Sequence, residues 1–252
     1  MNNFNQNLIN ELTNDGIVTI DNYFSEKDIK KLNLVFGSLK DDMIKYQSSL
    51  NDIKSLSNQV FNFINEKEIQ SLLRKYLAGE PHCTVVHFSK HKIKISGDEI
   101  SEIKNSGVCA FHNDDCGKQI KINILLSDLA ENSNGLDYAM GSHTLSLLDK
   151  TLIRFFNFFS LFKGWDKHFL IYFINKYYHK IRQNFCYEKK ILQKYKIKKI
   201  FGRIGKIYIF DTNGFHRQSV IKKLPEKLVD RKVLTLYFIN KDKLNLSSKK
   251  VN

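Results

Sequence analysis

The chain has 252 residues, of which 42% are hydrophobic, and its formal net charge is +14. Chains of this length can form one domain of the β-barrel or jelly-roll type, and we find no internal repeat and no Pro/Gly/Ser-rich linker, so we expect a single domain over residues 1–252. The positive charge comes overwhelmingly from lysine, whereas nucleic-acid recognition favours arginine, so a nucleic-acid partner is not expected.

The cysteines and the first residues bear on the cellular compartment. Residues 1–7 lack the basic start and apolar run of a secretory signal. The four cysteines form no C-x-x-C pair, and the spacing of the two that flank residues 110–115 does not match a structural zinc site. We therefore expect reduced thiols and a cytoplasmic location.

The first segment with a clear chemical signature is residues 110–115, Ala-Phe-His-Asn-Asp-Asp. In an extended segment, side chains two positions apart share a face, so His112 and Asp114 point the same way. Asp115 points away from His112, and we place it beside the site rather than on a metal. The pair is one half of a possible metal centre.

A strand is predicted directly after this motif. Residues 120–126 are rich in apolar side chains, and β-branched isoleucine occupies alternate positions. The turn-rich residues 131–135 follow them. Asn123 interrupts the apolar pattern. Two orientations remain open for it: toward a bound cosubstrate, or outward beside Lys121.

The segment from about 145 to 200 carries the most aromatic part of the chain. Residues 152–162 and 169–178 predict two short helices, each with an apolar face and each too short for the roughly 20 residues of a membrane span. We expect them to form a lid inserted between the two halves of the site. Three roles remain open: packing on the barrel, lining a pocket for a bulky apolar substrate, or peripheral contact of residues 152–190 with a membrane surface.

The second half-site follows the lid. Residues 205–211 predict a strand, residues 212–214 a turn, and His216 opens the next extended segment. Two histidines and one carboxylate on one face of a metal leave other positions open, which is the arrangement of non-heme Fe(II) oxygenases. The sequence therefore predicts that His112, Asp114 and His216 bind one iron ion.

A candidate anion-binding residue lies further along. Arg231 heads an otherwise apolar strand predicted for residues 231–238. Burying a guanidinium is costly unless it meets a partner, and its planar fork pairs well with a carboxylate. Arg217 is a rival, but in a strand it points away from the face that carries His216.

Taken in order, these segments resemble the phytanoyl-CoA dioxygenase-type family of Fe(II)/2-oxoglutarate-dependent oxygenases. Residues 14–29 are similar to the opening strand and helix of the family, and residues 134–143 resemble its N-G … P-G-S-H segment, with Met140 in place of proline. The resemblance implies a mainly β fold with flanking helices, built on a double-stranded β-helix (jelly-roll or cupin-like) core.

The resemblance also implies a set of ligands. Fe(II) would be held by the histidine and aspartate residues named above, and Arg231 would hold the distal carboxylate of 2-oxoglutarate. Relatives often have serine two residues after the distal histidine, where this chain has Gln218 with Ser219 adjacent, and either residue can donate that hydrogen bond. His143 is expected to be a hydrogen-bonding loop residue rather than a ligand.

The implied reaction uses O2 to convert 2-oxoglutarate to succinate and CO2 while a substrate C–H bond is hydroxylated, with ascorbate as a reductant. Asp114 favours hydroxylation over halogenation, because halogenating relatives lack this carboxylate. We expect a small-molecule or lipid-like biosynthetic substrate, anionic or apolar. Two alternatives remain: a non-catalytic barrel that binds a ligand, and the same chemistry on a nucleic acid or protein.

Overall fold

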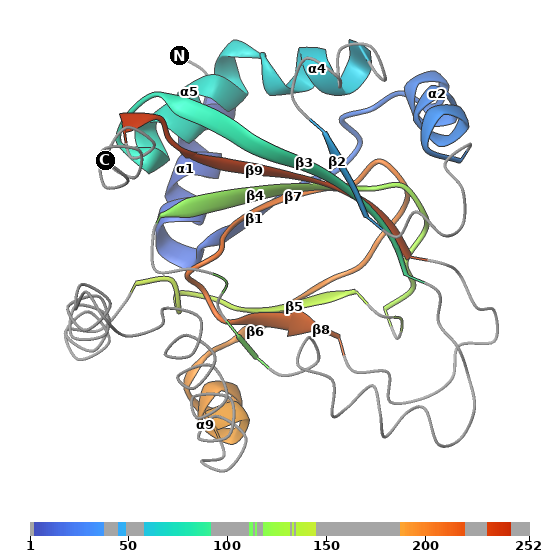
Figure 1. Cartoon of the computed structure of the whole chain (residues 1–252). Helices are drawn as coiled ribbons and strands as arrows, with labels where there is room; N and C mark the ends of the chain where they lie inside the picture. The colour runs from blue at the N-terminus through green and yellow to red at the C-terminus, as the bar shows by residue number, and fades with distance from the viewer. Residues whose placement is uncertain are drawn as a thin grey trace, which may run out of the picture.

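The computed structural model consists of two antiparallel β-sheets that face each other, with helices on the outer side of the larger sheet (Figure 1). The smaller sheet lies on the opposite side, next to a single described helix. The structure describes residues 3–37, 45–48, 58–91, 111–112, 114, 118–131, 133, 135–144, 187–219 and 231–242.

The larger sheet has six strands in the order β1-β7-β4-β9-β3-β2. All of its neighbours are antiparallel, and β9 pairs along its whole length with β3. Its strands are β1 (Ile17–Ile20), β2 (Lys45–Ser48), β3 (Pro81–His91), β4 (Gln119–Leu125), β7 (Ile207–Asp211) and β9 (Arg231–Asn240).

The smaller sheet has the order β6-β5-β8, with β5 (Leu136–Ala139) between β6 (Ile197–Ile200) and β8 (His216–Gln218). After β4, the chain crosses to this sheet for β5 and β6, returns for β7, crosses again for β8 and returns for β9. This alternation between facing sheets is the arrangement expected of a double-stranded β-helix, as predicted from the sequence.

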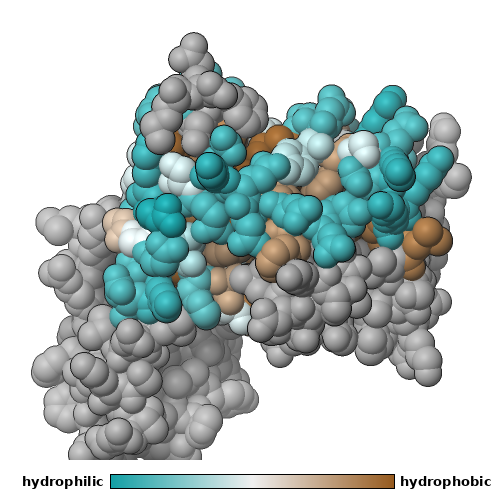
Figure 2. Space-filling model, turned by 90° about the horizontal axis from the view of Figure 1, so that it is seen from above, coloured by the Kyte–Doolittle hydropathy of each residue, from teal (hydrophilic) through white to brown (hydrophobic). Residues whose placement is uncertain are grey.

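Four of the described helices cover the outer face of the larger sheet. In α5, the buried residues recur at helical spacing and turn one apolar side toward the sheet. The outer surface of this layer is mainly hydrophilic (Figure 2), as expected for amphipathic helices. The helices are α1 (Asn3–Asp15), α2 (Glu26–Gly37), α4 (Asn58–Ile64) and α5 (Lys67–Leu77); α9 (Tyr187–Lys194) lies by the smaller sheet.

The two faces of the larger sheet have different chemistry, and β4 shows this best. Ile120, Ile122 and Ile124 are fully buried in the core beneath the helices. Burying each such side chain stabilises the fold by roughly 1.5–3 kcal/mol. The alternate residues face the smaller sheet, where Leu125 packs with Leu136 of β5. Polar residues of β4 on this second face therefore point into the space between the sheets.

The strands predicted at residues 120–126, 205–211 and 231–238 are confirmed as β4, β7 and β9. The two predicted lid helices lie outside the described residues. Residues 197–200, at the end of the predicted insertion, form β6 of the smaller sheet. The single domain over residues 1–252 stays a prediction. Among the described helices, none has the length and apolar character needed to cross a membrane.

Candidate metal centre

Main-chain hydrogen bonds join the two halves of the predicted metal centre. The N–H of His112 donates to the carbonyl of His216 (2.9 Å), and the N–H of His216 donates to the carbonyl of His112 (2.8 Å). Reciprocal bonds of this kind are those of an antiparallel ladder, so His112 lies beside β8. The N–H of Asp114 donates to the carbonyl of Thr212 (3.1 Å), in the turn before β8.

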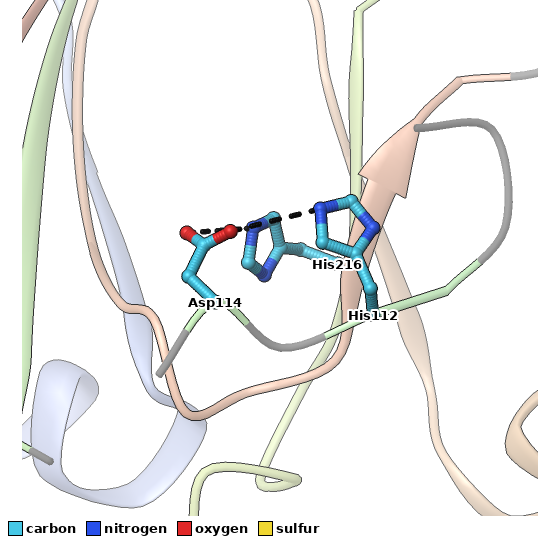
Figure 3. Close-up of side chains that lie close together, drawn as sticks. All are labelled: His112, Asp114 and His216. Carbon is cyan, nitrogen blue, oxygen red and sulfur yellow. Dashed lines mark ion pairs between the residues drawn. The ribbon is translucent and has the colours of Figure 1, made fainter. Parts of the chain in front are cut away.

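The three side chains converge on one point between the sheets (Figure 3). His112 Nε2 lies 3.7 Å from Asp114 Oδ1, and His216 Nε2 lies 3.3 Å from Asp114 Oδ2. One ligand atom from each residue lies within 4.8 Å of the others. With metal–ligand bonds of about 2.1 Å, two ligands at right angles are about 3 Å apart, so these donors fit around one ion after small adjustments.

The imidazole of His216 is held in the tautomer that a metal requires. Its Nδ1 lies 2.9 Å from the carbonyl of Gly214. A carbonyl only accepts hydrogen bonds, so Nδ1 carries a proton, and Nε2, the nitrogen that faces Asp114, is the one that can bind a metal once it gives up its own proton. A backbone carbonyl on the second ring nitrogen is a common feature of metal-binding histidines.

Exposure increases across the site from His216 to the other two residues. The His216 side chain is 5% exposed, whereas those of His112 and Asp114 are 23% and 26% exposed. One ligand is therefore set in the barrel wall and two stand at its rim. As far as the described residues show, one side of the centre is therefore accessible to further ligands.

Asp114 is held in its charged form. Burial alone raises the pKa of its carboxyl, but the interactions with His216 and Lys121 lower it by more, and the net pKa lies well below its ordinary value. The ammonium of Lys121 contacts Asp114 Oδ2 directly. A charged carboxylate beside an imidazole nitrogen is the donor set that a divalent transition metal needs.

Aromatic rings and a close-packed glycine support His216 from behind. The ring of Tyr138 is stacked near that of His216, with centroids 6.5 Å apart, and Phe210 meets it edge-on at 5.2 Å. The Tyr138 hydroxyl donates to the carbonyl of Asp211 (2.9 Å). A β-carbon added at Gly214 would lie 1.9 Å from this hydroxyl, so the turn fits against Tyr138 only with glycine there.

Asp211 organises the turn that leads to His216. Its carboxylate accepts hydrogen bonds from the Tyr76 hydroxyl (2.7 Å) and from the N–H of Asn213 (2.8 Å). Burial raises the pKa of Asp211, although these hydrogen bonds oppose the rise. The candidate metal ligand His216 is thus tied to helix α5 through a buried side-chain contact.

Arg231 is buried near the end of the smaller sheet. Its Nη1 donates to the carbonyl of Gly135 at 3.4 Å, and the same carbonyl accepts the N–H of Ser219 at 3.0 Å. The guanidinium therefore lies near Ser219, just beyond the end of β8. On β9, Arg231 shares the inner face with Thr235 and Tyr237.

Asn123 lies on the inner face of β4, between Tyr208 of β7 and Thr235 of β9. It is 95% buried, since its relative exposure is 5%. Its Oδ1 has no hydrogen-bond partner among the described residues, which is costly unless a ligand or water supplies one. The alternative that Asn123 points outward beside Lys121 is wrong, because both side chains point between the sheets.

Gln218 and Ser219 lie on opposite faces of the chain after His216. Asp137, buried on β5, accepts hydrogen bonds from Arg217 Nε (2.9 Å) and Ser219 Oγ (2.7 Å). The register pairs Arg217 with Asp137 and His216 with Tyr138, so Arg217 points away from the metal ligands, as predicted. By alternation, Gln218 shares the face of His216.

His143 is a hydrogen-bonding loop residue, as predicted: its Nε2 lies 2.9 Å from the carbonyl of Thr13. Two contributors were not foreseen from the sequence. For Lys121 the sequence offers one weak indication of a role at the site, because a charged residue is unusual in an apolar strand. For Asp211 the sequence offers no such indication, because its partner Tyr76 lies in a helix far away in the sequence.

No family model matches the sequence, and no curated protein matches it. Solved structures do resemble the chain. SnoK, a non-heme alpha-ketoglutarate-dependent carbocyclase from nogalamycin biosynthesis, aligns with a TM-score of 0.57 and 9% identity over 93% of this chain and 84% of SnoK. SnoN, an epimerase with the same dependence and from the same biosynthesis, aligns at 0.56 and 9% over 94% and 83%.

EctD from S. alaskensis, crystallised with bound Fe, aligns with a TM-score of 0.52 and 12% identity, over 92% of this chain and 75% of EctD. Another EctD structure contains 2-oxoglutarate and 5-hydroxyectoine. At these identities the likeness shows the fold. The chain has the fold of non-heme Fe/2-oxoglutarate-dependent enzymes, which is the fold that the sequence resemblance implied.

Proposed function

We propose that the protein is an Fe(II)- and 2-oxoglutarate-dependent oxygenase of the phytanoyl-CoA dioxygenase type that hydroxylates a C–H bond of a small molecule. The observation that carries the proposal is the convergence of His112, Asp114 and His216, whose ligand atoms lie within 4.8 Å of one another at an accessible rim. Two imidazoles and one carboxylate suit Fe(II), which activates O2 and a 2-oxo acid when bound.

The residues beside the centre support a dicarboxylate cosubstrate. Arg231 supplies a guanidinium inside the barrel, and Asn123 is buried on the inner face of β4, where its amide Nδ2 can donate to a carboxylate. We assign the distal carboxylate of 2-oxoglutarate to Arg231. Of the two polar residues after His216, we favour Gln218, because the Ser219 hydroxyl is engaged with Asp137.

The fold neighbours support the same chemistry with a small-molecule substrate. EctD has been crystallised with Fe, and with 2-oxoglutarate and 5-hydroxyectoine. SnoN and SnoK depend on alpha-ketoglutarate but catalyse epimerisation and carbocycle formation. Hydroxylation of this chain's substrate is therefore our assignment from Asp114, which takes a coordination position that halide would need.

The test is succinate release. The protein is purified without oxygen, loaded with Fe(II) and incubated in air with 2-oxoglutarate, ascorbate and a metabolite extract. We expect succinate to form only when Fe(II) and O2 are both present, slowly without the extract and faster with it. His112→Ala should abolish both Fe(II) binding and succinate formation.

Two results contradict the proposal. One is a lack of succinate under all conditions while His112→Ala leaves the metal content unchanged. The other is tight binding of Zn²⁺ or Ni²⁺ by the anaerobically purified protein without any turnover of 2-oxoglutarate in the Fe(II) form. Either outcome would make the chain a binding protein with this fold.

A further inference from the structure

Lys121 is the only described lysine whose ammonium contacts a ligand of the candidate metal centre. It lies on the inner face of β4, and its side chain is 13% exposed. The ring of Tyr237 lies 4.8 Å from its Nζ and that of Phe210 lies 5.9 Å away. Two aromatic walls therefore hold the ammonium in place through cation–π attraction.

Backbone hydrogen bonds fix the position of Asp114 relative to Lys121. The N–H of Thr212 donates to the carbonyl of Gln119 (3.0 Å), and the carbonyl of Thr212 accepts the N–H of Asp114 (3.1 Å). Gln119 begins β4, two residues before Lys121. The position of the ammonium relative to the carboxylate is thus fixed by strands and by one turn rather than by a flexible surface pairing.

The contact is made to one oxygen of Asp114. Lys121 contacts Oδ2, which also lies 3.3 Å from His216 Nε2, while Oδ1 faces His112 Nε2 at 3.7 Å. A free carboxylate can bind a metal ion through one oxygen or chelate it through both. An ammonium held on one oxygen competes with the second metal bond, both for the lone pair and through repulsion between cations.

We propose that Lys121 is a positioning residue that occupies one oxygen of Asp114, so that the carboxylate gives the metal a single oxygen. This inference rests on the proposed function. In an octahedral site, two imidazoles and one oxygen leave three positions; a chelating 2-oxo acid takes two, and one remains for O2. A chelating Asp114 would remove that last position.

The experiment uses nitric oxide as a probe of the last position. Anaerobic protein is loaded with Fe(II) and 2-oxoglutarate, and nitric oxide binding is followed by electron paramagnetic resonance, with Fe(II) and 2-oxoglutarate affinities measured separately. Lys121→Met keeps the apolar stem and removes the charge. Lys206→Met is the matched control, because Lys206 is also a mostly buried lysine paired with an aspartate, Asp21 (3.1 Å).

We expect Lys121→Met to keep or gain Fe(II) affinity and to keep 2-oxoglutarate affinity, but to bind nitric oxide about tenfold or more weakly, because a carboxylate that chelates through both oxygens would occupy the last position. Lys121→Arg should restore nitric oxide binding, because a guanidinium can donate to the same oxygen. Lys206→Met should match the wild type in all three measurements.

Three other outcomes overturn the inference. Unchanged nitric oxide binding in Lys121→Met means that the contact has no effect on coordination. A loss of Fe(II) affinity means that Lys121 only supports the local fold, and a selective loss of 2-oxoglutarate affinity makes it a direct ligand of the cosubstrate. If wild-type protein binds neither Fe(II) nor 2-oxoglutarate, the proposed function itself fails, which is a separate result.

Discussion

The hydroxyl of Tyr76, in helix α5, donates a 2.7 Å hydrogen bond to the carboxylate of Asp211, the last residue of β7. The bond is buried and joins the helical layer to the turn that carries His216 to the metal centre. The same turn is closed by the N–H of Asn213, which donates to the other carboxylate oxygen (2.8 Å). One contact thus links the packing of a helix to the placement of a candidate metal ligand.

Tyr76→Phe removes this hydrogen bond and leaves a buried carboxylate with one donor fewer. We expect the free energy of unfolding to fall by about 1–3 kcal/mol. We also expect Co²⁺, used as a probe for the site, to bind about tenfold more weakly, because the turn before His216 loosens. Urea denaturation and metal titration measure the two effects.

The matched control is Tyr23→Phe, since Tyr23 donates to the carboxylate of Glu66 at a part-buried position away from the centre. It should lose stability but bind Co²⁺ as the wild type does. Equal metal affinities for the two variants would show that the Tyr76 contact does not position His216.

Asp211 should give the protein a distinctive pH dependence. Burial raises the pKa of this carboxyl in the folded state above the roughly 3.9 expected in the unfolded chain. The folded state therefore binds the proton more tightly, and the resulting stabilisation is complete at low pH and declines as pH rises through the folded pKa. Asp211→Asn removes the titration, so the stability of the wild type minus that of the variant should fall with increasing pH from about pH 4 upward. A difference that is constant with pH would contradict the assignment.

Substitution of two buried arginines, Arg231 and Arg217, should affect different properties of the protein. Arg231→Ala should weaken 2-oxoglutarate binding about tenfold or more, as expected from losing one charge-assisted pair, with little change in metal affinity. Arg217→Ala leaves Asp137 buried without its cationic partner, which should cost about 3–5 kcal/mol of stability. The folded fraction of this second variant should bind the cosubstrate normally. Isothermal titration and denaturation separate the two effects, and equal losses of cosubstrate affinity would reject the assignment to Arg231.

Gly214→Ala should damage the metal site directly. The added methyl would lie 1.9 Å from the Tyr138 hydroxyl, so either the ring or the turn must move. The turn also orients His216, because Nδ1 of His216 donates a hydrogen bond to the carbonyl of Gly214. We expect Co²⁺ affinity to fall at least about tenfold. Gly141→Ala is the control: its backbone φ is +77°, so it carries strain, but its methyl would meet only a carbonyl at 3.7 Å. It should lower stability and spare metal binding.

Cys83 should resist alkylation in the native protein. Burial raises the pKa of its thiol to about 12, and its Sγ lies 3.7 Å from the carbonyl of Val85. Since only the thiolate reacts, labelling at pH 8 should be slower than for an ordinary cysteine by roughly a thousandfold. Peptide mass spectrometry after iodoacetamide treatment checks this, and rapid labelling of Cys83 in the folded state would contradict it.

The core strands and the candidate ligand set were predictable because their signals are local. Alternating apolar residues define β4, β7 and β9 wherever the chain goes, and the period of two already placed His112 and Asp114 on one face. The same rule placed Arg217 away from His216, which the register with Asp137 confirms.

The orientation of Asn123 was not predictable, because a strand with two buried faces leaves no solvent side to orient a polar residue. The sequence alone allowed it to face outward beside Lys121. The structure places both side chains between the sheets, where Lys121 meets Asp114 and Asn123 is buried.

By itself, the sequence indicated the candidate ligands, the core strands and the fold class, since these follow from side-chain chemistry and short-range periodicity. Only the tertiary structure decided which groups surround the ligands. Lys121 on Asp114, Gly214 on His216 and Tyr76 on Asp211 are contacts set by sheet register and helix packing, which depend on residues far apart in the chain. A local pattern contains no information about such distances, because they are fixed only when the whole core packs.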